Sequence, residues 1–321
     1  MIDRLASHAA GNAPQIKYVP ASWWQMIPFL RMNFELVRDI DPLAERILSN
    51  PWAPSSLLEY AYMSGTFLRS ITHFITISGE RAGVTWTYYR AGIGFILSVG
   101  ILRQFRQAGM GMQTIGFIES YVKSRGGNAL VAVMGRRNKP VRFLASAAGG
   151  HPLGLATTTL TLSGPPAPTL ATRFEIGPIN AKEAAQAWKR WRLHEVEQVA
   201  GASGAEVAAR LLASYSWLEP LPRGMHLSLH QNGREIGCAH VRQHRKETRL
   251  YLFPSHTLWS GDDAADLIAS LTCYLNSPIT HLELTQTHAD MLAVDAPFSF
   301  ERLEDRDRLY SFKLLCDADI T

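Results

Sequence analysis

Two hydrophobic patterns alternate along the chain, and each predicts its own kind of element. Apolar residues recur at helical spacing from Ala21 to Val37, with Trp24, Ile27 and Leu30 on one face. Runs rich in β-branched and aromatic residues predict strands instead. The first half is expected to contain, in order, a strand at Ile16–Val19, helices at Ala21–Val37, Leu43–Leu48 and Ser55–Phe67, strands at Ile71–Ser78, Val84–Arg90 and Gly94–Leu102, a helix at Met112–Lys123, a strand at Ala129–Met134, a helix at Pro140–Ala147 and a strand at Leu155–Leu162.

The second half repeats this order in outline. Its clearest local feature is the dipeptide Asn232-Gly233, which predicts a tight hairpin turn between two alternating runs. The expected elements are a strand at Phe174–Ile176, helices at Ala181–Val199 and Glu206–Tyr215, a hairpin of His226–His230 with Glu235–Gln243, a strand at Arg249–Phe253, a helix at Asp262–Leu275, a strand at His281–Thr285, a short helix at Asp290–Ala293 and a strand at Leu309–Leu315. A repeated order of this kind indicates a tandem duplication.

A proline-rich stretch separates the two halves. Residues 163–168 read Ser-Gly-Pro-Pro-Ala-Pro, which can continue neither a helix nor a central strand. We therefore predict an α/β protein with mixed sheets in two tandem domains, residues 1–163 and 170–321, joined by a linker at residues 164–169. A length of 321 residues suits two domains.

Charge is divided unevenly between the halves. The net charge is +4, but residues 1–165 carry 16 Lys and Arg against 8 Asp and Glu, and the remainder carries 16 against 20. A basic first half suits a polyanionic small ligand such as a nucleotide-containing cofactor. The basic residues are scattered rather than clustered with exposed aromatic residues, so we expect no nucleic-acid partner.

Several classes of protein are not expected. No run of 18 apolar residues occurs, so we expect no membrane span, and the absence of a signal peptide leads us to expect a cytoplasmic protein. The three cysteines Cys238, Cys273 and Cys316 are widely spaced, which favours neither a disulfide framework nor zinc. His226 and His230 share a strand face but lie about 13 Å apart by strand rise, so we expect no metal site.

The stretch with the strongest chemical content is Ser98–Glu119. A buried strand runs into a turn with Gly109 and Gly111, and a helix begins there. Glycines let the backbone approach a phosphate closely, and the N–H groups of a helix start point at it. Arg103 and Arg106 add positive charge beside the turn. This arrangement predicts an anion site.

The sequence from Arg106 to Gly111 resembles the pyrophosphate-binding motif of the GNAT acetyltransferases. Asn138, after the next strand, resembles the asparagine of that family, and the resemblance covers about Ile71–Leu162. It implies an acyl-CoA site, with acetyl-CoA as cofactor. The residues that the resemblance assigns to cofactor binding are Val99, Gly100, Ile101, Arg106, Gln107, Ala108, Gly109, Met110, Gly111, Met112 and Asn138.

The chain departs from the family pattern where catalysis is concerned. Many members carry a tyrosine in the helix after the asparagine and a glutamate on the central strand, and this chain has neither at those positions. We therefore predict other acid–base candidates: His73, Tyr88 and Tyr89 on the hairpin strands, and His151 after the short helix. Histidine can act as a base near neutral pH, and tyrosine can donate a proton to a thiolate.

The equivalent turn in the second half, Ser255–Asp263, has one glycine and two adjacent aspartates, Asp262 and Asp263. Carboxylates at a helix start repel a pyrophosphate, so we predict a degenerate second copy without acyl-CoA. We expect that copy either to shape the acceptor cleft or to form a homodimer. The function indicated is acetyl transfer to a primary amine on a small molecule or peptide; the alternative is an inactive acyl-CoA-binding or scaffold protein.

Overall fold

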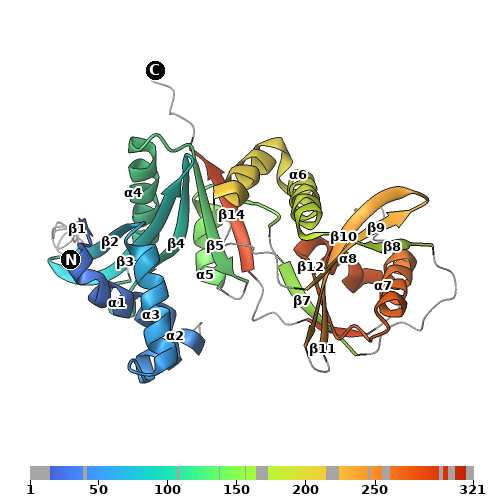
Figure 1. The fold of residues 1–321 in the computed structure, drawn as a ribbon. Coiled ribbons are helices and arrows are strands. Elements are labelled where there is room, and N and C mark those ends of the chain that lie inside the picture. Colours follow the sequence, from blue (N-terminus) through green and yellow to red (C-terminus); the bar gives the residue numbers. More distant parts are fainter. Residues whose placement is uncertain are drawn as a thin grey trace, which may run out of the picture. The chain divides into compact units, whose positions relative to one another are not determined.

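The structure is a computed structural model that describes residues 15–38, 42–106, 109–136, 138–155, 157–163, 173–214, 224–244, 247–254, 261–295, 299–302 and 308–315. The chain divides into two compact units. Unit 1 consists of Met1–Ala132 with Leu314–Thr321, and unit 2 consists of Val133–Lys313. The boundaries between the units fall within strands β5 (Ala129–Gly135) and β14 (Arg308–Leu314), which are labelled in Figure 1.

Unit 1 combines antiparallel strands with a parallel strand pair that a helix connects. The elements that begin in it are β1 (Ile16–Pro20), η1 (Trp23–Gln25), α1 (Met26–Val37), α2 (Pro42–Ser49), α3 (Pro54–Phe67), β2 (Ile71–Ile77), β3 (Glu80–Arg90), β4 (Ile93–Ile101), η2 (Arg103–Phe105), α4 (Met110–Ser124) and β5 (Ala129–Gly135). Strands β1 to β4 pair antiparallel, and α4 crosses between β4 and its parallel neighbour β5.

Unit 2 repeats this plan. Its elements are α5 (Lys139–Ala147), β6 (His151–Pro152), β7 (Thr157–Leu162), β8 (Glu175–Pro178), α6 (Ala181–Ser214), β9 (Met225–Gln231), β10 (Arg234–His244), β11 (Glu247–Pro254), α7 (Gly261–Leu275), β12 (His281–Thr285), α8 (Gln286–Asp295), β13 (Phe300–Arg302) and β14 (Arg308–Leu314). Strands β8 to β11 pair antiparallel, and α7 crosses between β11 and its parallel neighbour β12. The predicted α/β class with two similar halves is confirmed.

The last strands of the two halves are exchanged between the sheets. The strand orders are β1-β2-β3-β4-β5-β14-β6 and β13-β7-β12-β11-β10-β9-β8. Thus β7, from the first half of the sequence, pairs with β12 and β13 in the second sheet. Strand β14, from the end of the chain, pairs with β6 and stands beside β5 in the first sheet.

This exchange corrects two strand placements. Leu155–Leu162 does not close the first sheet, and Leu309–Leu315 does not close the second. Both sheets have an equivalent place for a last strand, and the alternation within a strand does not say which sheet takes it. The predicted linker, residues 164–169, lies outside the described residues, so the domain boundaries at 163 and 170 stay predictions.

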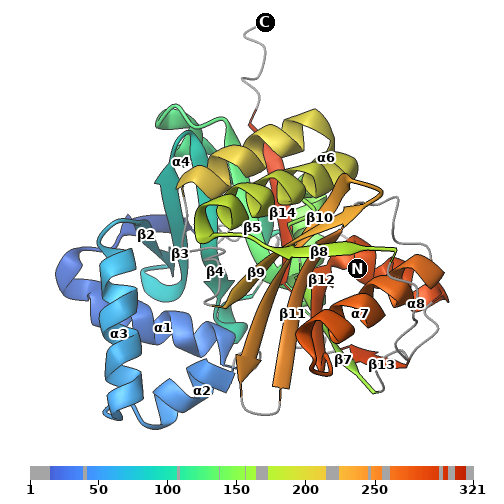
Figure 2. The same cartoon turned by 45° about the vertical axis from the view of Figure 1, so that its right-hand side comes forward.

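Helices cover both faces of the sheet in unit 1, with α1, α2 and α3 on one face and α4 on the other (Figure 2). Under α1 lies a buried aromatic cluster in which the Phe29 ring meets Phe67, Phe74 and Trp86 edge-on at centroid distances of 5.3, 5.6 and 5.8 Å. Aromatic pairs of this geometry add to the stability gained from area burial alone. The cluster fixes α1 against β2 and β3.

In unit 2, two turn positions follow the sequence directly. Asn232 and Gly233 both have positive φ, 53° and 72°, and the predicted hairpin between β9 and β10 is confirmed. The two predicted helices around residue 201 are the arms of α6, which Gly201 interrupts with φ 67° and ψ −175°. Glycine adopts this conformation at little steric cost, so it sets the position of the kink.

Candidate functional site

The candidate site of unit 1 begins where β4 ends and α4 starts. Gly109 is the N-cap of α4 and has φ 82°, a left-handed conformation that disfavours every residue with a Cβ. The first bond of the helix runs from Gln113 N–H to Gly109 O at 3.0 Å. The N–H groups of Met110, Gly111 and Met112 precede that bond, so they have no acceptor within the helix. They form the positive end of a 15-residue helix.

Strand β4 changes its pairing just before this turn. Among the described residues, its ladder with β5 runs from Ile93↔Ala129 to Ile96↔Ala132, whereas its ladder with β3 continues to Gly83↔Ile101. The register with β3 shifts between Trp86 and Thr87, which leaves Leu97 as the extra residue of a β-bulge. The bulge stands where the pairing with β5 ends.

The backbone alternation shows where the remaining N–H groups of β4 point. The N–H group of Leu102, the residue after β4, donates to Ala82 O at 2.7 Å and therefore points toward β3. Since N–H directions alternate along a strand, those of Val99 and Ile101 point away from β3. Of the three predicted β4 residues, Val99 and Ile101 are therefore placed to donate backbone hydrogen bonds to a ligand.

Gly100 has a packing role that explains its lack of a side chain. A Cβ at this position would lie 3.0 Å from Leu36 Cδ1 of α1, closer than nearly all real contacts. Glycine here lets α1 lie close against β4. The packing against α1 is thus a structural reason for a glycine at position 100.

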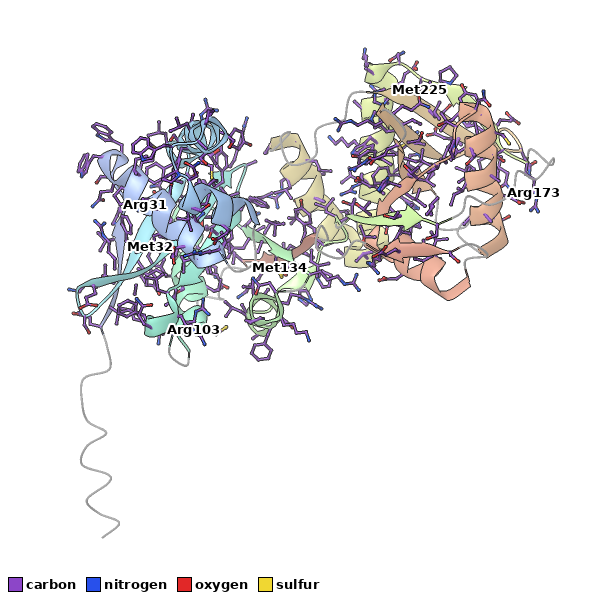
Figure 3. The ribbon with its side chains drawn as sticks, turned by 90° about the horizontal axis from the view of Figure 1, so that it is seen from below. Arg31, Met32, Arg103, Met134, Arg173 and Met225 are labelled. Atoms are coloured by element: carbon purple, nitrogen blue, oxygen red, sulfur yellow. The ribbon has the colours of Figure 1, made fainter. Side chains whose placement is uncertain are left out.

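Two arginines flank the turn, and one of them holds it in place. Arg106 Nε donates to Ile101 O at 2.9 Å, and Arg106 is exposed. Arg103 is exposed as well (Figure 3). Met110 is buried in a small apolar cluster with Ile77 and Ala82, which anchors the first turn of α4. Anchoring by Met110 and the charge of the two arginines together give an electropositive start of α4. Gln107 and Ala108, the other residues predicted there, lie outside the described residues.

His73 lies beneath α4, in the core of unit 1. Its ring meets Phe117 and Tyr121 edge-on at 5.0 and 5.2 Å, and it is only 4% exposed. Burial lowers the pKa of His73 to about 4, so the imidazole is neutral at pH 7. His73 lines a void of about 10 Å³, and its Nδ1 has no hydrogen-bond partner among the described residues.

The two candidate tyrosines are neighbours on β3 and therefore point to opposite faces of the sheet. Tyr89 lies on the face covered by α4, where its hydroxyl donates to Arg125 O at 2.7 Å, at the end of that helix. Tyr88 stands opposite Phe95 of β4. Both tyrosines are half-buried.

Asn138 and His151, the remaining candidates, belong to unit 2. Asn138 is the N-cap of α5, and its Oδ1 accepts from Val141 N–H at 3.3 Å. His151 is exposed on β6, with its ring 6.2 Å from that of Phe312. The helix cap gives Asn138 a structural role that a sequence motif does not reveal.

The second half differs at the corresponding helix start. Arg173 pairs with Asp263 at 3.2 Å and with Asp266 at 3.0 Å, beside the first turn of α7 (Figure 3). Residues 255–260 and the side chain of Asp262 lie outside the described part of the chain. Carboxylates at and near the start of α7 favour an arginine over a phosphate.

The structure also joins two histidines that sequence spacing did not relate. His226 and His240 are opposite each other on β9 and β10, with their Nδ1 atoms 3.0 Å apart. Burial lowers the pKa of His226.

No group of three or more possible metal ligands occurs in the part of the chain that the structure describes. None of the described helices is long and apolar enough to span a membrane.

Comparison with known proteins supports the fold. No family model matches the sequence, and neither does any curated protein. Among solved structures, a GCN5-related N-acetyltransferase from Kribbella flavida superposes with a TM-score of 0.52 at 11% identity, covering 94% of this chain and 71% of that one.

Two further structures are weaker matches. A tandem GNAT protein from the clavulanic acid biosynthesis pathway has a TM-score of 0.47 at 14% identity, covering 95% of this chain and 100% of that one. A GCN5-related N-acetyltransferase from Sphaerobacter thermophilus has a TM-score of 0.48 at 14% identity, covering 94% and 96%.

The fold defines the chain as a two-sheet α/β protein in which a parallel strand pair joined by a helix occurs twice. This fold is similar to that of the GCN5-related N-acetyltransferase from Kribbella flavida, a GNAT protein. The resemblance expected from the turn at Gly109 is thereby confirmed at the level of the fold.

Proposed function

We propose that this chain is an N-acetyltransferase that uses acetyl-CoA and acts on a primary amine. The observation that carries the proposal is the left-handed Gly109 at the start of α4, which follows the bulged strand β4 and the short helix η2 along the chain. That combination provides an anion site beside outward-pointing strand N–H groups. The structure from Kribbella flavida is only 11% identical to this chain and supports the fold alone, so the proposed activity rests on this site.

The residues present fit an acyl-CoA ligand. The N–H groups of Met110, Gly111 and Met112 suit a pyrophosphate, and the exposed Arg103 and Arg106 add charge of the right sign. The N–H groups of Val99 and Ile101 suit an amide-bearing arm laid along β4, in the manner of an added strand.

In the proposed reaction, acetyl-CoA supplies an activated acetyl thioester. The contribution of the chain is to position the reactants and to polarise the carbonyl oxygen through an N–H group of β4. The amine must also lose a proton to a base. His73 is a weak candidate because burial keeps it under α4 with a pKa of about 4. We retain Tyr88, Tyr89 and His151 as candidates for the proton transfers.

The second half contributes differently. The ion pairs of Arg173 with Asp263 and Asp266 favour a start of α7 without bound phosphate. We propose that this copy has lost acyl-CoA binding and serves the acceptor or a homodimer. The acceptor is a small molecule or a peptide with a primary amine.

One observation favours a second function, that of an acyl-CoA-binding or scaffold protein without activity. Strand β4, IGFILSVGI, carries no acidic side chain, and α5, KPVRFLASA, contains no tyrosine. Such a protein would bind acyl-CoA without transferring its acyl group.

The test is release of free CoA thiol from acetyl-CoA, measured with a panel of primary amines and peptides. We expect release to depend on one class of amine and to be lost in Gly109→Val. Binding of acetyl-CoA with no release from any amine would favour the inactive alternative. Release that is unchanged in Gly109→Val would contradict the site.

A further inference from the structure

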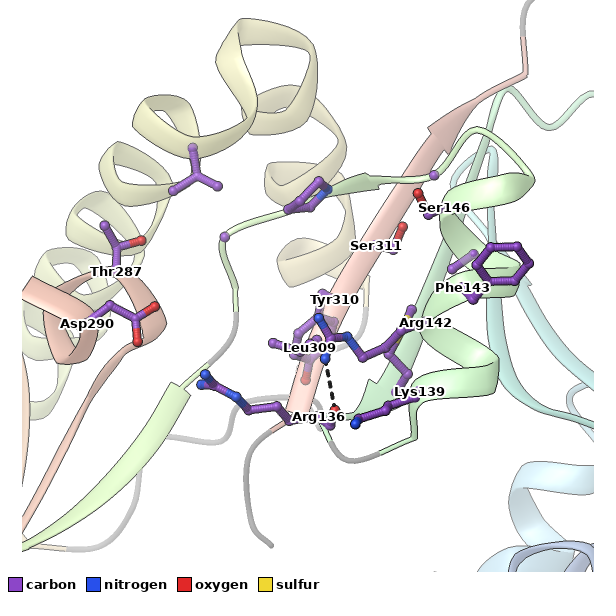
Figure 4. A pocket seen from close by; sticks show the side chains of 16 residues that line it. Arg136, Lys139, Arg142, Phe143, Ser146, Thr287, Asp290, Leu309, Tyr310 and Ser311 are labelled. Carbon is purple, nitrogen blue, oxygen red and sulfur yellow. Dashed lines mark hydrogen bonds between the residues drawn. The ribbon is translucent and has the colours of Figure 1, made fainter. Parts of the chain in front are cut away.

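A second feature of the molecule, separate from the turn at Gly109, is a pocket within unit 2. Its volume is about 750 Å³, and its walls come from α5, the residues next to it, β14, α6 and α8 (Figure 4). Pockets of about 300–1,000 Å³ are typical sites for small organic molecules. None of the residues that we assign to acyl-CoA lines this pocket.

The charge of the pocket wall is positive. Arg136, Lys139 and Arg142 line it from one short stretch of chain, and Figure 4 shows them on the same side. Arg142 Nη1 donates to Arg136 O at 3.2 Å, which holds its guanidinium over the turn before α5. The one carboxylate among the described lining residues is Asp290, and it pairs with Arg302 at 2.7 Å. A concave surface with surplus positive charge concentrates anions.

The same wall has an aromatic component. Phe143, which follows Arg142 on α5, is 77% exposed, and Tyr310 of β14 lines the pocket with it. An exposed ring beside arginines offers an apolar surface next to groups that bind carboxylates or phosphates in a forked geometry. The pocket thus combines an anion-binding side with a surface for a ring.

We propose that this pocket binds a small organic anion, in which a carboxylate or phosphate is joined to an aromatic or apolar part. Arg136, Lys139 and Arg142 hold the anionic group, and Phe143 and Tyr310 contact the apolar part. The inference goes beyond the proposed acetyltransferase activity, because it concerns other residues and does not require acyl-CoA to bind.

The first experiment is calorimetric titration of the whole protein with phenyl phosphate, benzoate, inorganic phosphate and benzylamine. We expect phenyl phosphate or benzoate to bind, and the stronger of the two identifies the preferred anionic group. Inorganic phosphate should bind at least tenfold more weakly, because it lacks the ring. Benzylamine has a similar size and the opposite charge, so it should not bind. Equal binding of benzylamine, or no binding of either aromatic anion, would overturn the proposal.

Variants then locate the site. Arg142→Glu should weaken binding of the aromatic anion at least tenfold, and Phe143→Ala should weaken it towards the value for inorganic phosphate. Arg90→Glu is the matched control, because Arg90 is also an exposed arginine but lies at the end of β3 in unit 1. All three positions are exposed, so we expect far-UV circular dichroism to show folded proteins. An equal effect of Arg90→Glu would indicate a general charge effect and refute the site.

A competition experiment separates this pocket from the proposed cofactor site. Saturating acetyl-CoA should leave the affinity for the aromatic anion within twofold, and Gly109→Val should do the same. Displacement by acetyl-CoA would show that both bind in one place and would overturn the proposal. If acetyl-CoA fails to bind at all, the proposed function fails, while the titrations with aromatic anions still decide the pocket.

Discussion

Replacing Gly109 by valine tests the anion site with an internal control at the other end of the same helix. Gly109 precedes α4 with φ 82°, and Gly126 follows it with φ 76°. A Cβ added at either glycine would meet nothing within 4 Å, so the two positions are equally open to a first side-chain atom. Both variants force a β-branched residue into the left-handed region, where it is disfavoured. Only Gly109 belongs to the candidate site.

The two variants should lose similar amounts of stability but differ in their affinity for acetyl-CoA. An L-residue in the left-handed conformation costs about 1–2 kcal/mol, so Gly109→Val and Gly126→Val should each lower the free energy of unfolding by at least that much. Relief of the strain at position 109 reorients the N–H groups that start α4. Loss of one hydrogen bond to a charged ligand costs about 1.5–3 kcal/mol, which corresponds to roughly 10- to 150-fold in affinity.

Two measurements check the prediction on both variants. Urea denaturation gives the free energies of unfolding, and calorimetric titration gives the affinity for acetyl-CoA. We expect similar losses of stability, and weaker binding only in Gly109→Val. If the two variants bind acetyl-CoA equally well, the turn does not hold the cofactor. If both lose binding in proportion to their loss of stability, the effect is one of folding, and the assignment again fails.

Three further predictions concern stability. Because the folded-state pKa of His73 is about 4, the unfolded chain takes up a proton there at a higher pH than the folded protein does, so this residue should lower the free energy of unfolding by roughly 1–3 kcal/mol as the pH falls from about 6.5 to about 4. Urea denaturation of the wild type and His73→Phe at pH 7 and 5 should show a smaller pH dependence of stability in the variant. An equal pH dependence would contradict the burial argument. Asn138→Ala removes the N-cap of α5 and should cost about 0.5–2 kcal/mol, whereas Asn138→Asp should retain most of the stability; equal losses in thermal unfolding would argue against the cap. In unit 2, the buried Thr285 hydroxyl donates to Glu195 at 3.0 Å and lies 2.7 Å from His288 Nδ1. Thr285→Val should therefore lower the free energy of unfolding by about 1–3 kcal/mol, measured by urea denaturation. A loss below about 0.5 kcal/mol would show that these hydrogen bonds add little to stability.

Local sequence signals predicted most of the elements, because each depends on a pattern within a few residues. The Asn232-Gly233 turn is one example, and the interruption of α6 at Gly201 is another. Strand β3 begins at Glu80, four residues before the predicted start at Val84, because the turn before it is as short as Ser78-Gly79. Such short turns depend on positive φ, which both residues adopt.

Long-range pairing was not predictable in the same way. The segment TTTLTL of β7 has a strand pattern that fits either sheet, and only tertiary packing places it between β12 and β13. Strand β13 was missed because three residues carry no usable periodicity. The His226–His240 pair arises from the register of two strands and not from spacing within one.

The candidate site was predictable in part. The glycine turn and the helix start follow from the residues between Ile101 and Met112, and the structure places Gly109 as the cap of α4. The bulge at Leu97 has no sequence signal of its own, because it depends on how β3 and β4 pair. The pocket beside α5 was missed for a similar reason: its walls come from segments as distant as Arg142 and Tyr310.

The most direct test of the central claim is calorimetric titration of the whole protein with acetyl-CoA, with the stoichiometry determined. The account predicts one site per chain with micromolar affinity, since the turn at Gly109 suits the cofactor and the acidic start of α7 does not. Two sites would contradict the assignment of the second copy. The absence of any binding would contradict the proposed function itself.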